Sequence, residues 1–263
     1  MPDTESFIAL LEHGAVADLA QIITDHPRRV NTFLTQPAPH GSEQWMPMHF
    51  AARAGHLAAV ELMLEHRVHP DCRTRFNTPM HARQTPLHLA AAGGHFQVIE
   101  RLLEARAEIE VRDAQLRSPI WLAARHGHPQ VIAALAARRA DLETRDTQQR
   151  TPLHAALLPP KPRAEQSEAP DRLLPPPPIT FNPAAALALL DSGADPNATC
   201  PKEPEGFTPL HRCVALGDPA FDVAKRLIQD GANRTAVDPR TSRTPHALAL
   251  HLQRSAAWID LLA

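Results

Sequence analysis

The sequence has no tyrosine, and its eight phenylalanines and three tryptophans bring the aromatic fraction to only 4% of 263 residues. Enzymes of this size use aromatic side chains for much of their packing, so the core here must be built from Leu, Ile, Val and Ala. Long apolar runs are missing too. The longest, from Pro183 to Leu190, is far shorter than the roughly 18 residues that a membrane span requires. We therefore expect no membrane partner.

Cysteine is scarce, and neither sign of charge dominates. Cys72, Cys200 and Cys213 form no C-x-x-C pair, which disfavours a disulfide framework and fits a reducing compartment. The N-terminus opens acidic, without the apolar stretch of a secretory signal. A formal net charge of −2 excludes a generally basic nucleic-acid binder. We expect a cytoplasmic protein that binds no nucleic acid.

Proline, by contrast, is abundant, with 27 residues against 10 glycines, and six of the prolines keep a period. The segment Thr-Pro-Leu-His occurs at 85–88, 151–154 and 208–211, with degenerate copies at 46–49, 118–121 and 244–247. From one copy to the next, the intervals are 39, 33, 33, 57 and 36 residues. Two intervals of 33 set the period, and the others contain insertions. The sequence is therefore a repeat array.

Each repeat predicts a pair of short helices. Thr or Ser occupies an N-cap position and Pro follows at the first helical residue, where its missing N–H costs nothing. A Gly-His turn such as Gly94-His95 ends this helix, and apolar residues at helical spacing begin a second one. Neither helix is long enough to be stable alone, so each repeat must stack on its neighbours.

The Thr-Pro-Leu-His-x-Ala motif and the 33-residue period resemble the ankyrin repeat family. The resemblance implies an all-α solenoid of stacked helix pairs with short β-hairpin fingers. It covers residues 1–263 as a single domain, with a divergent N-terminal capping unit at 1–44 and six repeats over 45–263. It also implies that the motif histidine is buried and bonded to the next repeat.

Three features depart from the pattern. The finger at 72–84 is enlarged and carries several arginines, which suggests a contact loop or a tolerated insertion. A Pro-rich insertion at about 158–181 includes Arg172, Pro175 and Pro178 in a PxxP arrangement, so it is either a polyproline ligand or a surface loop. Trp121 replaces the motif histidine, and we expect it to fill space in the core.

An enzyme or a metal site remains an alternative with little support. The pairs His49/His56 and His88/His95 are the motif and Gly-His positions of single repeats and need no ligand, while His126 and His128 could bind a cation weakly and Cys200 lies near two other candidate ligands in sequence. No phosphate loop, nucleophile elbow or zinc-protease motif is present. We expect no catalysis and no cofactor.

The remaining interpretation is a non-catalytic protein–protein interaction module, acting as an adaptor, an inhibitor or an effector through its concave face of fingers and first helices. An acidic protein partner fits its arginine-rich fingers, and we expect a monomer. Arginine outnumbers lysine 24 to 3, which is compatible with a high-GC bacterium and with delivery into a host cell. By position in the repeat, the candidate partner-binding residues are Trp45, Arg53, Arg73, Arg75, Phe76, Gln84, Gln115, Arg117, Arg125, His126, Gln148, Arg150 and Phe207.

Overall fold

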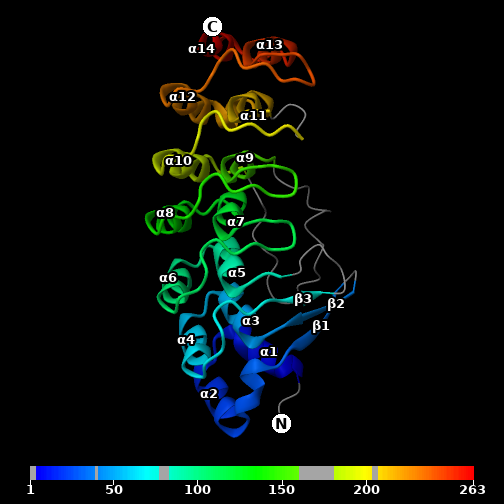
Figure 1. Ribbon diagram of the computed structural model, residues 1–263, viewed down its shortest axis with the longest axis vertical. Coiled ribbons are helices and arrows are strands. Elements are labelled where there is room, and N and C mark those ends of the chain that lie inside the picture. The colour runs from blue at the N-terminus through cyan, green and yellow to red at the C-terminus, as the bar shows by residue number, and fades with distance from the viewer. Residues whose placement is uncertain (1–3, 39–40, 77–82, 160–180, 203–206) are drawn as a thin grey trace. The chain divides into compact units, whose positions relative to one another are not determined.

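Helix pairs follow one another along the chain in a computed structural model that describes residues 4–38, 41–76, 83–159, 181–202 and 207–263 (Figure 1). The expected all-α fold of stacked helix pairs with short β-strands is confirmed. Most of the Pro-rich insertion, including Arg172, Pro175 and Pro178, lies outside the described residues. The chain divides into two compact units, Met1–Pro119 and Ile120–Pro162 with Pro178–Ala263, and each is described by itself.

The first unit contains six helices in three pairs, a 3-10 helix and three short strands within its described residues. In chain order these are α1 (Thr4–His13), α2 (Val16–Asp25), the 3-10 helix η1 (Pro27–Asn31), β1 (Leu34–Ala38), β2 (Gly41–Trp45), α3 (Pro47–Ala54), α4 (Leu57–Glu65), β3 (Arg75–Phe76), α5 (Pro86–Gly93) and α6 (Phe96–Glu104). The first pair lies in the divergent N-terminal unit and lacks a Thr-Pro start. In each later pair the first helix begins at the repeat proline.

A three-stranded antiparallel sheet extends the fingers of the first unit, in the order β1-β2-β3. Leu34 pairs with Trp45 and Ala38 with Gly41 in the hairpin, while Phe76 of β3 pairs with Glu43. Pro37 lies in β1, which is an edge strand of the sheet. Proline is tolerated there, because the open side of an edge strand forms no hydrogen bonds to another strand. The enlarged finger at 72–84 therefore supplies a strand to the sheet.

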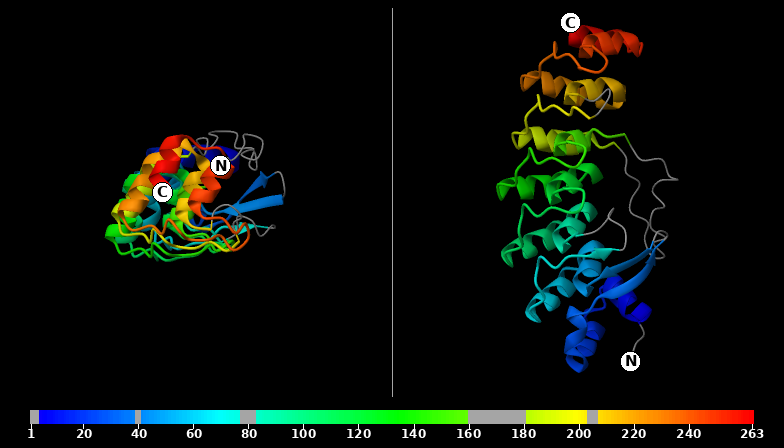
Figure 2. Two further views of the ribbon diagram at one scale, coloured as in Figure 1. Left: turned by 90° about the horizontal axis from the view of Figure 1, so that it is seen from above. Right: turned by 45° about the vertical axis from the view of Figure 1, so that its right-hand side comes forward.

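The second unit continues the pattern with helices that begin at the repeat prolines. Its elements are α7 (Pro119–His126), α8 (Pro129–Ala137), α9 (Pro152–Ala156), α10 (Pro183–Asp191), α11 (Pro209–Leu216), the 3-10 helix η2 (Asp218–Ala220), α12 (Phe221–Gln229), α13 (Pro245–His251) and α14 (Ala256–Leu262). The helix α9 ends where the insertion begins, and α10 restores the second helix of that repeat. Figure 2 shows the helices of successive repeats layered within this unit.

Small and aliphatic side chains fill both cores. In α5, Leu87, Ala90 and Ala91 are fully buried, and alanines of this kind allow neighbouring helices to approach closely. An aromatic cluster closes the C-terminal end, where the fully buried Trp258 meets Phe221 edge to face with ring centroids 5.0 Å apart. The low aromatic content therefore follows from the close packing of the helix pairs.

Candidate interaction surface

The motif histidines form a ladder of buried hydrogen bonds from each repeat to the next. The Nδ1 atom of His88 accepts from the Thr85 backbone N–H at 3.1 Å, and its Nε2 donates to the Arg117 carbonyl at 3.0 Å. His49 and His211 make the same bonds to the carbonyls of Cys72 and Arg243. Because Nδ1 accepts, the ring is held as the neutral Nε2–H tautomer. Burial lowers the pKa of His49 and of His88 to about 4.

Trp121 takes the place of the histidine in this ladder. Its side chain is only 3% exposed, which confirms the packing role, and its indole Nε1–H donates to the Arg150 carbonyl at 3.3 Å. The tryptophan therefore keeps the bond to the next repeat as well as filling the core. His154 in α9 is the exception, since its buried Nε2 atom finds no hydrogen-bond acceptor within the described chain.

A second ladder uses residues that lie just before the start of a second helix. His95 Nε2 donates to the Arg53 carbonyl at 2.7 Å, so it bonds the end of the preceding first helix. Two other residue types do the same in the second unit, where Asn182 donates to the Gly127 carbonyl at 2.9 Å and Arg254 to the Val214 carbonyl at 2.9 Å. These contacts explain many of the histidines without a ligand.

The geometry also bears on the metal alternative. The rings of His126 and His128 stack with centroids 6.4 Å apart. Within the ranges that the structure describes, no group of three or more His, Cys, Asp or Glu lies together in a way that could hold a metal ion. Cys200 is buried with its Sγ atom 3.4 Å from the Gln148 carbonyl, and Cys213 is fully buried in the core.

Two of the candidate arginines are tied into their own fingers. The buried Asp113 accepts the backbone N–H groups of Gln115 and Arg117 on one oxygen, both at 2.9 Å, and the Arg117 guanidinium on the other at 2.7 Å. Asp146 and Arg150 repeat this arrangement with a 2.8 Å ion pair. Each arginine therefore helps to shape a finger and leaves about a fifth of its side chain exposed.

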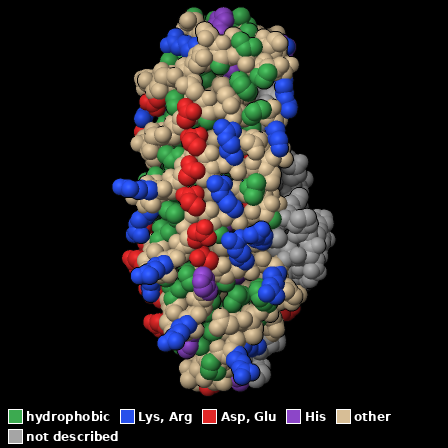
Figure 3. All heavy atoms as spheres, viewed as in Figure 1, with side chains coloured by type: hydrophobic (Ala, Val, Ile, Leu, Met, Phe, Trp, Pro, Cys, Tyr) green, Lys and Arg blue, Asp and Glu red, His purple; other side chains and the backbone are tan. Residues whose placement is uncertain are grey.

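Other finger arginines bond neighbouring fingers together within each unit. In the first unit, Arg73 donates to the Arg112 carbonyl at 3.2 Å. In the second, Arg145 donates to the Thr199 carbonyl at 2.7 Å. On the face shown in Figure 3, acidic side chains gather beside the basic ones. This face is therefore not uniformly basic.

The structure separates the sequence-predicted residues into buried and accessible positions. Trp45, Gln84 and Arg125 are buried, at 4%, 8% and 9% exposure. Trp45 packs on Phe50, and Arg125 donates to the carbonyls of Leu158 and Pro159 at 3.2 and 3.0 Å. These three positions serve packing, so we leave them out of the proposed contact surface.

The other candidates reach the surface to different degrees. Arg75 is exposed, with its guanidinium 4.3 Å above the Phe33 ring, and Gln148 is exposed. The backbone of Phe76 pairs in the sheet, but its side chain lies outside the described part of the structure. The half-buried candidates are Arg53, Arg73, Gln115, Arg117, His126, Arg150 and Phe207.

Sequence reasoning missed two apolar side chains near finger tips. Leu116 in the first unit is 50% exposed, and Val237 in the second is 52% exposed. Leu116 also adopts a φ of 60°, in the left-handed region that favours glycine. The sequence did carry one signal for Leu116, which is a large apolar residue in a turn position that favours glycine.

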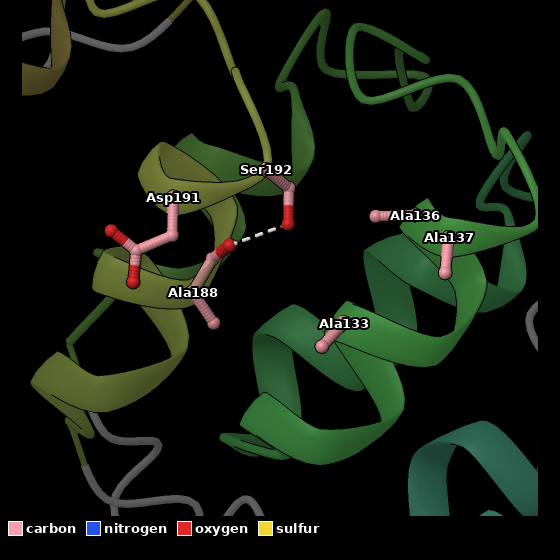
Figure 4. A pocket seen from close by; sticks show the side chains of 6 residues that line it. All are labelled: Ala133, Ala136, Ala137, Ala188, Asp191 and Ser192. Atoms are coloured by element: carbon pink, nitrogen blue, oxygen red, sulfur yellow. Dashed lines mark hydrogen bonds between the residues drawn. The ribbon is translucent and has the colours of Figure 1, made fainter.

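A shallow hollow of about 420 Å³ lies between α8 and α10 (Figure 4), lined by Ala133, Ala136, Ala137, Ala188, Asp191 and Ser192. The Ser192 hydroxyl donates to the Ala188 carbonyl at 2.7 Å. The Asp191 carboxylate accepts from Arg226 at 2.6 Å. The hollow thus exists because its walls are alanines, and its polar groups are engaged in structural contacts.

The comparisons with known proteins agree with this geometry. The family model described as "Ankyrin repeats (3 copies)" matches residues 8–113 and 87–159, and the model "Ankyrin repeat" matches residues 205–239. No protein of curated function matches the sequence. None of the helices within the described residues is long and apolar enough to cross a membrane.

Two solved structures share the fold. The human ASB11 ankyrin repeat domain is 22% identical, with 97% of this chain and 95% of that chain covered and a TM-score of 0.71. The ankyrin repeat domain of Bcl-3, described as a unique member of the IkappaB protein family, is 19% identical, with 97% and 96% covered and a TM-score of 0.67. At these identities the likeness concerns the fold.

Proposed function

The chain belongs to the ankyrin repeat family, and from this premise we propose that it binds a partner protein through its fingers and first helices. It does so without catalysis of its own, as an adaptor, an inhibitor or an effector, and as a monomer in the cytoplasm or in a host cell. The repeat motif residues are committed to internal ladders. Recognition therefore depends on the side chains that vary between repeats.

The exposure of large side chains on the fingers carries this proposal. Leu116 and Val237 expose about half of their apolar surface, and Arg75 extends from the finger sheet of the first unit. Exposed apolar groups beside arginines are typical of protein contact surfaces, where a few such residues supply most of the binding energy. Folding gives no reason to place them there.

The test is affinity capture with wild-type protein beside one surface variant of each unit. Arg75→Glu with Leu116→Ser changes the first unit, and Gln148→Arg with Val237→Ser changes the second. The matched controls are Gln97→Arg in α6 and Gln130→Arg in α8, because both residues are exposed on second helices.

We expect at least one finger variant to lose a partner by about tenfold, while both controls recover it fully. Far-UV circular dichroism verifies that each variant is folded. Equal recovery of every partner by the finger variants and the wild type would overturn the proposal. Loss of a partner only in the α6 or α8 variants would instead assign the partner-binding surface to the second helices.

A further inference from the structure

The helices α13 and α14 form the outermost layer of the second unit (Figure 1) and leave two large apolar side chains accessible. Leu250 in α13 is 51% exposed, and Ile259 in α14 is half-buried. Leu250 lies five residues after the repeat proline Pro245, and Ile259 is the fourth residue of its helix. Both positions can therefore be compared with their equivalents in the other repeats.

The same two positions are buried in every earlier repeat of the second unit. Five residues after the repeat proline stand Ala124, Leu157 and Val214, each at 1% exposure or less. At the fourth residue of the second helix stand Ile132, Ala186 and Ala224, all fully buried. Along this unit, first helices pack on first helices, as α11 does on α13, and second helices on second helices, as α10 does on α12. The helix pair of the following repeat is therefore what covers these positions.

The repeat of α13 and α14 keeps the apolar part of this interface but not its polar part. Where the other repeats have the motif histidine or Trp121, it has Ala247, whose side chain carries no hydrogen-bond donor. It therefore cannot make the ladder bond to a carbonyl of a covering segment. A contact on this face depends instead on the burial of apolar area at Leu250 and Ile259.

The outer helices of a repeat array ordinarily carry a polar face toward solvent. The helix α2 of the first unit fits this rule, because Asp18, Gln21 and Asp25 are exposed on it. Leu250 and Ile259 break the rule at α13 and α14. Their exposed surface adds nothing to the stability of the folded chain, whereas covering it would be favourable.

We propose that α13 and α14 bind an amphipathic helix of a partner protein, which covers Leu250 and Ile259 in the way that a following repeat would. A helix is selected because this face continues the interface between repeats, and helices cover the same positions throughout the second unit. The assignment rests on the proposed function only in that the partner is a protein. It adds a contact surface separate from the fingers.

A second copy of this chain fits the face less well. The junction between α11 and α13 joins two different faces, since Val214 lies on the covered helix and Arg254 of the covering repeat donates to its carbonyl. Two copies related by a two-fold axis would place like faces together. A head-to-tail copy would bring up the polar residues of α2. An apolar helix of a different sequence meets neither difficulty.

Fluorescence anisotropy with a labelled helical peptide tests the assignment. The probe has about fourteen residues, or about four turns, with leucine at i, i+3, i+4 and i+7 and with glutamate and lysine elsewhere. The companion probe has the same composition, with its leucines spread around the helix. Leu250→Ser and Ile259→Ser are the test variants. Phe96→Ser is the matched control, because Phe96 is an exposed apolar residue on α6.

We expect the wild type to prefer the amphipathic peptide by about tenfold, both test variants to lose that preference, and Phe96→Ser to keep it. Hydrogen exchange of the wild type with bound peptide should show added protection in α13 and α14. The urea midpoint of Leu250→Ser should match that of the wild type, since the side chain that it removes is exposed. If Ile259→Ser fails to fold, Leu250→Ser alone decides.

Equal binding of the two peptides by the wild type overturns the assignment, and so does equal binding of the amphipathic peptide by Leu250→Ser and Phe96→Ser. A lowered urea midpoint in Leu250→Ser would assign that side chain to folding instead. A dimer in analytical ultracentrifugation that Leu250→Ser converts to a monomer would assign the face to a second copy.

The finger variant Val237→Ser separates this assignment from the proposed function. It should bind the amphipathic peptide as the wild type does, because Val237 lies outside α13 and α14. Failure of the peptide experiment leaves the finger surface in place if the capture experiment succeeds. Failure of the capture experiment, with peptide binding that still depends on Leu250, refutes the finger surface and leaves the helix-binding face.

Discussion

Acidification is expected to remove much of the stability of this chain within the range in which histidine titrates. The motif histidines are neutral and buried in the folded state, and the pKa is lowered to about 4 for His49, about 4 for His88 and about 3 for His154. The ordinary value is 6.5. Because the folded-state pKa is lower, unfolding takes up protons. Stability is therefore complete above about pH 7 and falls as the pH drops toward 4.

The magnitude follows from linkage. Between about pH 7.5 and 5.5, an unfolded histidine of pKa 6.5 gains about 1.4 kcal/mol from protonation that the folded state does not share. The three histidines together therefore cost about 4 kcal/mol. His95 and His211, whose pKa values burial also lowers, act in the same direction. A typical domain has only about 5–15 kcal/mol of stability in total.

Urea unfolding at these two pH values, followed by circular dichroism, measures the change. Burial raises the pKa of Glu12 and of Glu143, and this acts in the opposite direction at lower pH, so the comparison stays above about pH 5.5. His88→Gln should be less stable at neutral pH yet lose about 1.4 kcal/mol less on acidification, whereas the exposed His251→Gln should behave as the wild type. A wild-type change below about 1 kcal/mol, or unchanged pH dependence in His88→Gln, would refute the argument.

Two further variants test single contacts by urea unfolding. Trp121→Phe removes the indole N–H that reaches the Arg150 carbonyl and should cost about 2 kcal/mol, and a cost near zero would show that the bond contributes nothing. Arg139→Gly should stabilise the folded chain by about 0.5 kcal/mol, because Arg139 has a φ of 63°, in the region that favours glycine. Arg138→Gly should destabilise the folded chain, because Arg138 has an ordinary φ of −89°. The same sign for both variants would contradict the backbone explanation.

The sequence predicted the helices well because their boundaries are marked by local chemistry. Pro86 opens α5 behind the cap Thr85, and Gly94 ends it at a φ of 77°. The hairpin of β1 and β2 is one of the fingers that the family resemblance implied, although local propensity did not mark it, because its strands contain Pro37 and few β-branched residues. The third strand of its sheet comes from the finger of the next repeat, which sequence patterns within one repeat do not report.

The candidate surface was predicted less well, because a repeat register shows which positions vary but not where their side chains turn. Arg125 occupies a variable position, yet it folds onto the carbonyls of Leu158 and Pro159, where the insertion cuts α9 short. The role of Arg117 was accessible, since Asp113 precedes it by four residues and the same spacing recurs with Asp146 and Arg150. A repeated acid–base spacing within a turn indicates an internal pair.

The departures from the repeat motif fall into two physical classes, and only one of them points to function. Trp121, Asn182 and Arg254 differ from histidine, yet each still donates to the carbonyl that its ladder requires. Those positions preserve a hydrogen-bond donor, so a change of residue type there leaves the contact between repeats in place. The exposed apolar side chains of Leu116 and Val237 satisfy no such internal requirement. A surface that folding does not explain is where a binding partner should leave its mark, and these are the positions at which recognition should first be sought.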